Sequence, residues 1–160
     1  MHLAPRVYFA VALACVVCIA PRAARACSCT NDLTLQQEFD LSTGVFSGRV
    51  LSVAPSYEPG LNWVVFQPIT RWKGSLSDPF VVLTPDNGAI CGYPFAAGGE
   101  YLVFYGIRYF GITYTPTPFT HLCSRTSPLA GNTYVPLLPP PVLPVPIHHR
   151  SWGELKVIYR

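Results

Sequence analysis

The fold class is decided by residues 63–72, W-V-V-F-Q-P-I-T-R-W. β-Branched and aromatic residues dominate this stretch, and such residues are enriched in strands. Its first four residues, Trp63 to Phe66, are all apolar, so a strand here presents apolar side chains on both faces of its sheet. A tightly curled sheet with a helix packed over one end would bury both faces. We therefore expect an all-β sandwich or small closed barrel.

Similar runs lie on both sides of this stretch and are divided by turn-forming residues such as Pro59-Gly60 and Gly98-Gly99. Including the opening stretch, we predict strands over Val45–Val53, Trp63–Trp72, Phe80–Thr84, Glu100–Tyr105 and Gly111–Thr115. One early helix is predicted over Asn31–Leu41, capped by Asn31 or Asp32. The chain of 160 residues is long enough for one such domain.

Residues 1–26 are typical of a cleavable signal peptide. An apolar run extends from Val7 to Ala20, and Ala24-Arg25-Ala26 places small residues at the two positions that a signal peptidase recognises. The alternative is a retained anchor, for which the run is short. We therefore predict a secreted or extracellular protein that begins at Cys27, located in the periplasm or on the cell surface if the source is bacterial.

Charge and motifs exclude several classes of function. The precursor has 11 Lys and Arg against 8 Asp and Glu, but removing Arg6, Arg22 and Arg25 with the signal peptide leaves a neutral chain. No basic stripe remains to follow a nucleic acid, and no later segment resembles a membrane span. The motifs of serine hydrolases, zinc proteases and nucleotide-binding loops are missing. We predict no enzymatic activity, no catalytic residue and no cofactor.

The histidines of the mature chain give no catalytic pattern. His121 precedes Cys123 by two residues and has no acidic or hydroxyl partner at an informative spacing, so we expect it to be structural or exposed. His148 and His149 lie next to each other after a proline-rich stretch and make a poor metal site.

The C-terminal part changes in composition. Six prolines lie between Pro136 and Pro146, which predicts an extended, polyproline-like segment. We divide the mature chain into a domain over residues 27–130, a Pro-rich spacer over 131–150 and a tail over 151–160. Trp152, Leu155 and Tyr159 fit one helix face. The tail therefore either frays, packs on the domain, or docks on a partner.

Four cysteines remain after cleavage: Cys27, Cys29, Cys91 and Cys123. An even number in a short exported chain indicates disulfides, for which three connectivities exist. The competing interpretation is a four-thiolate zinc site, but such sites normally use two close pairs of the C-x(2–4)-C kind. In an extended segment Cys27 and Cys29 point the same way, so two bonds to distant partners would fix the amine and carbonyl of Cys27 for chelation of another protein's metal.

Several motifs occur in the order found in the tissue inhibitors of metalloproteinases. They are C-S-C at 27–29, V-F-S-G-R-V at 45–50, W-K-G at 72–74, C-G-Y at 91–93, Y-L-V-F at 101–104 and L-C at 122–123. From Cys27 to Pro128 the chain resembles the netrin-like N-terminal domain of this family. The resemblance implies a five-stranded OB-fold barrel with one or two short helices, and we expect the disulfides Cys27–Cys91 and Cys29–Cys123.

The resemblance also implies a function, inhibition of zinc metalloendopeptidases. In that family the amine and carbonyl oxygen of the N-terminal cysteine bind the catalytic zinc and displace its water. Carried over, Cys27 chelates a zinc ion supplied by the partner protease. Ser28 would point into the primed-side specificity pocket, and Cys29 and Thr30 would contact the protease cleft.

The chain departs from the family pattern and leaves two alternatives open. The family's third disulfide and cysteine-rich second domain have no counterpart, and Asn31 stands where those inhibitors carry proline. One alternative is a non-inhibitory netrin-like extracellular interaction module. The other is a lipoprotein acylated on Cys27, against which Arg25 argues and in which the amine would be capped.

Overall fold

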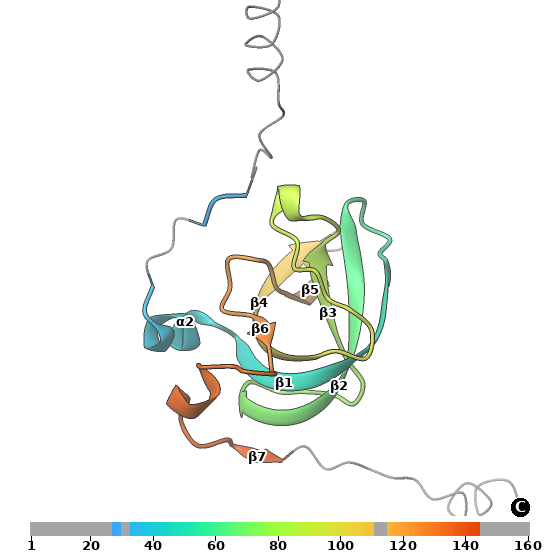
Figure 1. Ribbon diagram of the computed structural model, residues 1–160. Coiled ribbons are helices and arrows are strands. Elements are labelled where there is room, and N and C mark those ends of the chain that lie inside the picture. Colours follow the sequence, from blue (N-terminus) through green and yellow to red (C-terminus); the bar gives the residue numbers. More distant parts are fainter. Residues whose placement is uncertain (1–26, 30–32, 111–114, 145–160) are drawn as a thin grey trace, which may run out of the picture.

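The chain folds into a strongly curved β-sheet with a short α-helix beside it. A computed structural model describes residues 27–29, 33–110 and 115–144 (Figure 1). The strands are β1 (Gly44–Pro55), β2 (Leu61–Lys73), β3 (Phe80–Pro85), β4 (Glu100–Phe110), β5 (Thr115–Phe119), β6 (Ser127–Pro128) and β7 (Leu143–Pro144). The helix is α2 (Leu35–Leu41), and 3-10 turns occur at η1 (Gly88–Ile90) and η2 (Val135–Leu137). No helix in these ranges has the length and apolarity to cross a membrane.

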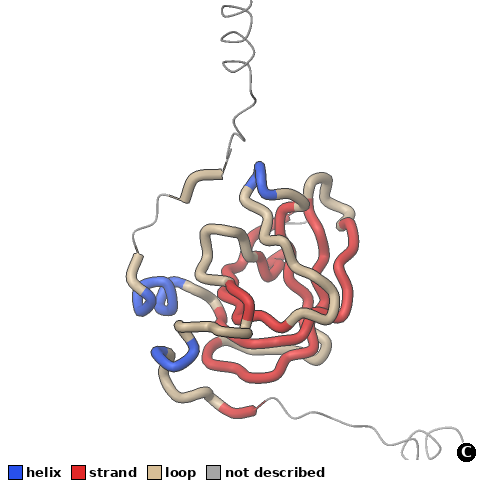
Figure 2. The backbone as a smooth tube through the Cα atoms, viewed as in Figure 1, coloured by secondary structure: helices blue, strands red, loops and turns tan. Residues whose placement is uncertain are grey.

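The sheet closes partly into a ring. Its strand order is β1-β2-β3-β5-β4-β6, and β1 also pairs with β4. The closure is thinnest between β3 and β5, which pair only through Leu83 and Phe119. Figure 2 shows the strands curling around a common interior. The predicted mostly-β class with a short helix and disulfides is confirmed.

Bulges in β1 produce part of the curvature. The pairing of β1 with β2 shifts register at three places between Val45 and Ser52, and such irregularities bend a strand and increase its twist. Pro68 lies opposite Gly48, next to one of these shifts. Proline cannot donate to a ladder and is tolerated in strands at such positions. The same part of β1 is therefore able to pair with β2 on one side and with β4 on the other.

Aromatic side chains fill the inside of the curved sheet. Phe46 is fully buried and meets Phe66 and Phe80 edge to face, each at 5.3 Å between ring centroids. Burial alternates along residues 63–66 of β2. Val64 and Phe66 are buried, and Trp63 and Val65 are only half-buried. The expectation that both faces are buried is thus met on one face alone.

A second apolar cluster lies under α2 and contacts the first part of the predicted Pro-rich spacer. Val45, Trp72, Leu102 and Phe104 form it, and Leu35, Phe39, Leu129, Tyr134, Val135 and Leu138 pack against it. Figure 1 shows η2 beside α2 at this place. The described first part of the predicted Pro-rich spacer over 131–150 therefore packs on the domain, and β7 pairs with β2. Residues 145–150 and the predicted tail, with its docking partner, lie outside the described residues.

The helix starts later than predicted. Thr34 is its N-cap: its hydroxyl accepts from the backbone N–H of Gln37 at 3.2 Å, and the Gln37 side chain accepts from the backbone N–H of Thr34 at 2.9 Å. This reciprocal capping box outcompetes Asn31 or Asp32 as a cap. At the other end, Lys73 donates to the carbonyls of Phe39 and Asp40, both at 2.8 Å, which ties the helix to β2.

Most of the predicted fifth strand, residues 111–114 of Gly111–Thr115, lies outside the described residues. The described strand β5 shares Thr115 with the predicted one, continues to Phe119 and pairs with β4 from Gly106 to Phe110. Pro116 and Pro118 make this strand hard to predict from sequence, because proline normally argues against a strand assignment. Two prolines at alternate positions lack their N–H on the same edge, so the other edge is free to pair with β4.

A buried hydroxyl network joins β4 to the segment that carries Cys123. Thr120 is 1% exposed and donates to the carbonyl of Phe104 at 2.8 Å, with the hydroxyls of Thr126 and Ser124 at 2.9 and 3.0 Å. We predict that Thr120→Val lowers the free energy of unfolding by about 1–3 kcal/mol, because it leaves buried polar groups unpaired. Urea unfolding measures this loss.

The matched control for this prediction is Thr117→Val, whose hydroxyl donates to the nearby carbonyl of Thr115 at 3.2 Å. We expect it to cost less than about 1 kcal/mol. Equal losses in the two variants would mean that the network adds nothing beyond the loss of one hydroxyl.

Candidate functional site

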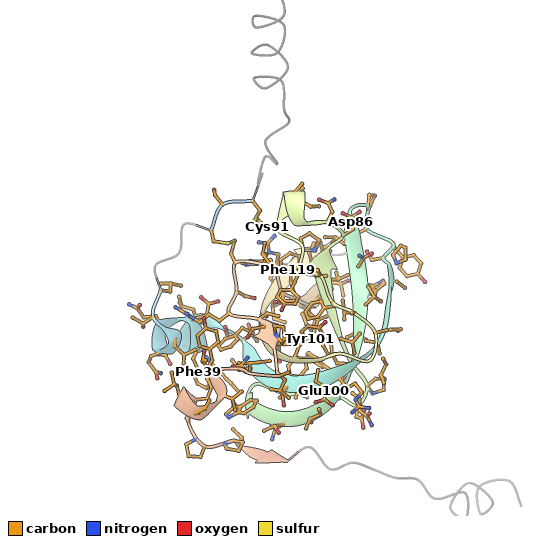
Figure 3. All side chains as sticks on the ribbon, viewed as in Figure 1. Phe39, Asp86, Cys91, Glu100, Tyr101 and Phe119 are labelled. Carbon is orange, nitrogen blue, oxygen red and sulfur yellow. A yellow bond between two sulfur atoms is a disulfide. The ribbon has the colours of Figure 1, made fainter. Side chains whose placement is uncertain are left out.

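Two disulfides attach the segment 27–29 to one end of the sheet. Cys27 is bonded to Cys91 and Cys29 to Cys123, with Cα atoms 5.1 and 5.2 Å apart. These are the two expected pairs. Ser28 lies between them and is exposed. Figure 3 shows Cys91 and Phe119 at the end of the sheet that the N-terminal segment reaches. Thr30, the remaining predicted contact residue, lies outside the described residues.

The conformation of the loop that carries Cys91 is set by a side-chain cap and by its tight backbone geometry. The Asn87 side chain caps η1 by accepting from the N–H groups of Ala89 and Ile90 at 2.9 and 3.3 Å. Cys91 has φ 65°, in the left-handed region, and Gly92 follows in close contact with the end of β3. A Cβ at Gly92 would lie 2.2 Å from the carbonyl oxygen of Pro85, so only glycine fits.

The loop that carries Cys123 is bonded to the first loop and to the sheet. The N–H of Leu122 donates to the carbonyl of Cys91 at 2.8 Å, and that of Thr120 donates to the carbonyl of Leu83 at 2.9 Å. The N–H of Cys123 donates to Nδ1 of His121 at 3.1 Å. Both disulfide partners of the N-terminal segment are therefore held by hydrogen bonds that do not involve sulfur.

A hollow of about 320 Å³ opens beside the N-terminal segment. Ser28, Cys29, Ile90, Arg108 and His121 are among its lining residues. The Arg108 guanidinium lies over the Phe119 ring at 4.1 Å, an arrangement that combines cation–π attraction with an exposed positive charge. The hollow can thus accept an apolar side chain with a neighbouring acidic group. Sequence reasoning missed Arg108, because the predicted fourth strand ended at Tyr105.

His121 has a structural role within this site. It is half-buried, and burial lowers its pKa below the ordinary value of 6.5, with a further lowering from the Arg108 cation. Neutral His121 accepts the Cys123 N–H through Nδ1, and protonation of that nitrogen removes the acceptor. The neutral imidazole is therefore the form that fits the fold.

This pKa shift predicts how stability depends on pH. As the pH falls, the unfolded chain takes up the His121 proton first, so the free energy of unfolding drops as pH passes below 6.5 toward the folded pKa. His121→Asn removes the titration and retains an acceptor for the Cys123 N–H, as in an Asx turn. We expect a flatter profile for the variant in urea midpoints measured from about pH 8 to about pH 5.5.

The shifted pKa of Glu38 affects the pH dependence of stability in the direction opposite to that of His121. Burial raises the pKa of Glu38 above its ordinary value of 4.5, and this shift favours the fold as the pH falls. An unchanged slope between neutral pH and pH 6 in His121→Asn would show that another group causes the pH dependence.

Comparison with protein-family models finds none that matches this chain, and comparison with curated proteins finds no significant match.

Proposed function

We propose that the protein is an exported inhibitor of zinc metalloendopeptidases that resembles the tissue inhibitors of metalloproteinases. Its free N-terminal amine and the carbonyl oxygen of Cys27 chelate the zinc of the protease. The single observation that carries the proposal is the attachment of Cys27 and Cys29, two residues apart, to two separately anchored loops.

The attachment supports chelation because it limits the motion of a chain end. Termini are normally the loosest part of a domain, and a loose ligand loses orientational entropy when it binds. Here the residues on both sides of Ser28 are covalently held, and their partner loops are hydrogen-bonded to each other. The amine and carbonyl of one residue close a five-membered ring on a metal, so a fixed Cys27 presents both ligands together.

The fold supports the proposal in its strand number and closure. Strands β1 to β5 make the partly closed ring, and β6 and β7 are two-residue additions. A five-stranded, partly open barrel is the description of the OB-fold, which is the fold implied by the resemblance. We propose the OB-fold on this basis.

Export is part of the proposal because the amine exists only after processing. Residues 1–26 have the pattern of a signal peptide, and disulfides of the kind seen here persist in oxidising compartments outside the cytosol. Cleavage after Ala26 would make the nitrogen of Cys27 a primary amine.

In the proposed complex, each group of the segment has one task. The amine must be neutral to bind zinc, and an α-amine with its ordinary pKa of about 7.7–8.0 is partly neutral near pH 7. Displacing the zinc-bound water removes the nucleophile of the protease. The exposed Ser28 then enters the primed-side pocket, and Cys29 contacts the cleft beside it.

The test is an inhibition assay with the exported, processed protein. At micromolar concentration it is mixed with a panel of matrix-type and thermolysin-type zinc proteases, and we expect stoichiometric inhibition of at least one. The control is the same protein after selective carbamylation of its α-amine, which we expect to be inactive. Failure against every member would favour the non-inhibitory netrin-like interaction module.

A further inference from the structure

We propose that the reduced chain contains a soft-metal site in which the thiolates of Cys27, Cys29, Cys91 and Cys123 bind one Zn²⁺. This goes beyond the proposed inhibition, because it uses the sulfur atoms of this chain and a metal of its own. The disulfide-bonded form and the metal-bound form exclude each other.

The positions of the sulfur atoms suit a tetrahedral metal. The Sγ atoms of Cys27 and Cys123 belong to different disulfides and lie 3.7 Å apart. Those of Cys27, Cys29 and Cys123 all lie within 4.8 Å of one another, and Cys91 is bonded to Cys27. Zn–S bonds of about 2.3 Å place the sulfurs of a tetrahedral site about 3.8 Å apart. Cys91 lies outside this group of three. After reduction, the bonded pairs have to separate and the Cys91 sulfur has to approach Cys29 and Cys123 to reach this spacing.

The fold removes the objection raised by sequence spacing. One C-x-C pair and two distant cysteines are unusual for zinc in a linear chain. Here Cys91 follows η1 and Cys123 follows β5, and the bond from the Leu122 N–H to the Cys91 carbonyl joins the two loops. This bond does not depend on sulfur, so the loops keep two thiols together when the disulfides open.

The surroundings of the sulfurs are suited to a charged centre. Cys29 is exposed, which gives an ion a route in. Four thiolates around Zn²⁺ carry a net charge of −2, and Arg108 lines the same hollow as Cys29, Cys91 and Cys123. A neighbouring cation lowers the cost of that charge.

The chemistry balances with a thiol or phosphine as the reductant. Each protein disulfide accepts two electrons and two protons and becomes two thiols. A dithiol reductant is oxidised to its disulfide, and a phosphine to its oxide with oxygen from water. Zn²⁺ then displaces four thiol protons to the solvent.

The experiment uses the exported protein, reduced anaerobically with a phosphine and titrated with Co²⁺ and then with Zn²⁺. We expect one ion per chain by native mass spectrometry, with the visible absorption of tetrahedral Co²⁺–thiolate, and loss of that absorption when Zn²⁺ replaces Co²⁺. The oxidised protein should bind neither ion. If residues 1–26 are retained, the Cys15→Ser/Cys18→Ser variant is used, so that only the four cysteines of the site are counted.

Matched variants assign the ligands. Cys91→Ser and Cys123→Ser should each weaken Zn²⁺ binding by more than about tenfold, since even outer-shell partners of a metal contribute that much. Ser28→Ala, in the same segment, should leave affinity unchanged. Equal affinity of Cys91→Ser and the unsubstituted chain would overturn the proposal, as would a spectrum of two-thiolate coordination.

Loss of structure on reduction does not remove the test. Far-UV circular dichroism follows the sheet during the titration. If the reduced chain loses its sheet, recovery on adding one equivalent of Zn²⁺ supports the site, because metal binding then drives folding. Failure to recover overturns it. The inhibition assay uses the oxidised protein, so its failure is distinguishable from failure here.

Discussion

One alanine placed ahead of Cys27 is expected to abolish inhibition of zinc endopeptidases and to weaken binding by at least about 100-fold. The added residue turns the Cys27 nitrogen into an amide, which is a poor zinc ligand. It also moves the free amine by the length of a residue, about 3.3–3.6 Å. The two disulfides hold Cys27 and Cys29 in place, so these residues cannot shift to bring the displaced amine back to the zinc.

The matched control carries the same alanine after Arg160, at the other end of the chain. Its mass is identical, and we expect full potency. Inhibition constants are measured for both forms after mass spectrometry has verified their termini. Equal potency of the two extended forms would exclude the zinc-chelating amine, whatever the fold.

Removal of the Cys29–Cys123 disulfide is expected to give the second large effect. In the Cys29→Ser/Cys123→Ser variant, the cross-link between residues 94 apart is lost. The chain-entropy model gives a loss of about 4.6 kcal/mol in the free energy of unfolding, and less because the overlapping Cys27–Cys91 bond still restricts the unfolded chain. Guanidinium unfolding measures the loss, and inhibition should weaken in parallel because the segment is then held at one point.

The control for this variant changes the neighbouring residues instead. Ser28→Ala/Leu122→Ala replaces an exposed serine and a leucine that is 42% exposed, and it leaves both disulfides in place. Such exposed substitutions usually change stability by less than about 0.5 kcal/mol each. A similar stability for the two double variants would contradict the structural role of the Cys29–Cys123 bond.

The positions of strands β1 to β4 were predictable from the sequence. Their residues are β-branched or aromatic and lie between turn-forming residues, and this local pattern matches the structure observed. The continuation of the fifth strand to Phe119 was not predicted because of Pro116 and Pro118, which are tolerated where β5 pairs along its length with β4 and with β3 only at Phe119. That condition depends on tertiary arrangement and is absent from the local sequence.

At the two ends of the domain, local sequence was likewise insufficient to predict the structure. The helix start was misassigned because Asn31 and Asp32 are good caps in isolation, whereas Thr34 also has Gln37 three residues later. The proline-rich composition after residue 130 did not indicate that Tyr134 and Leu138 pack against the second apolar cluster. Prolines fix the backbone but do not prevent the residues between them from being buried.

The candidate site was partly predictable. The presence of two disulfides follows from counting cysteines in a chain with a signal-like N-terminus, whereas counting leaves three possible connectivities. The hollow lined by Arg108 and His121 did not follow, because it depends on β4 continuing to Phe110 and on β5 returning beside it. The close approach of the Cys27, Cys29 and Cys123 sulfurs depends on the same tertiary arrangement and not on sequence spacing.

The most direct test of the zinc-chelating account is the mass of the N-terminal peptide of the protein as an exporting host delivers it, after reduction and alkylation. We predict a peptide that starts at Cys27 with an unmodified α-amine. A peptide that retains any residue before Cys27, or a first residue that is acylated or otherwise blocked, would contradict the account.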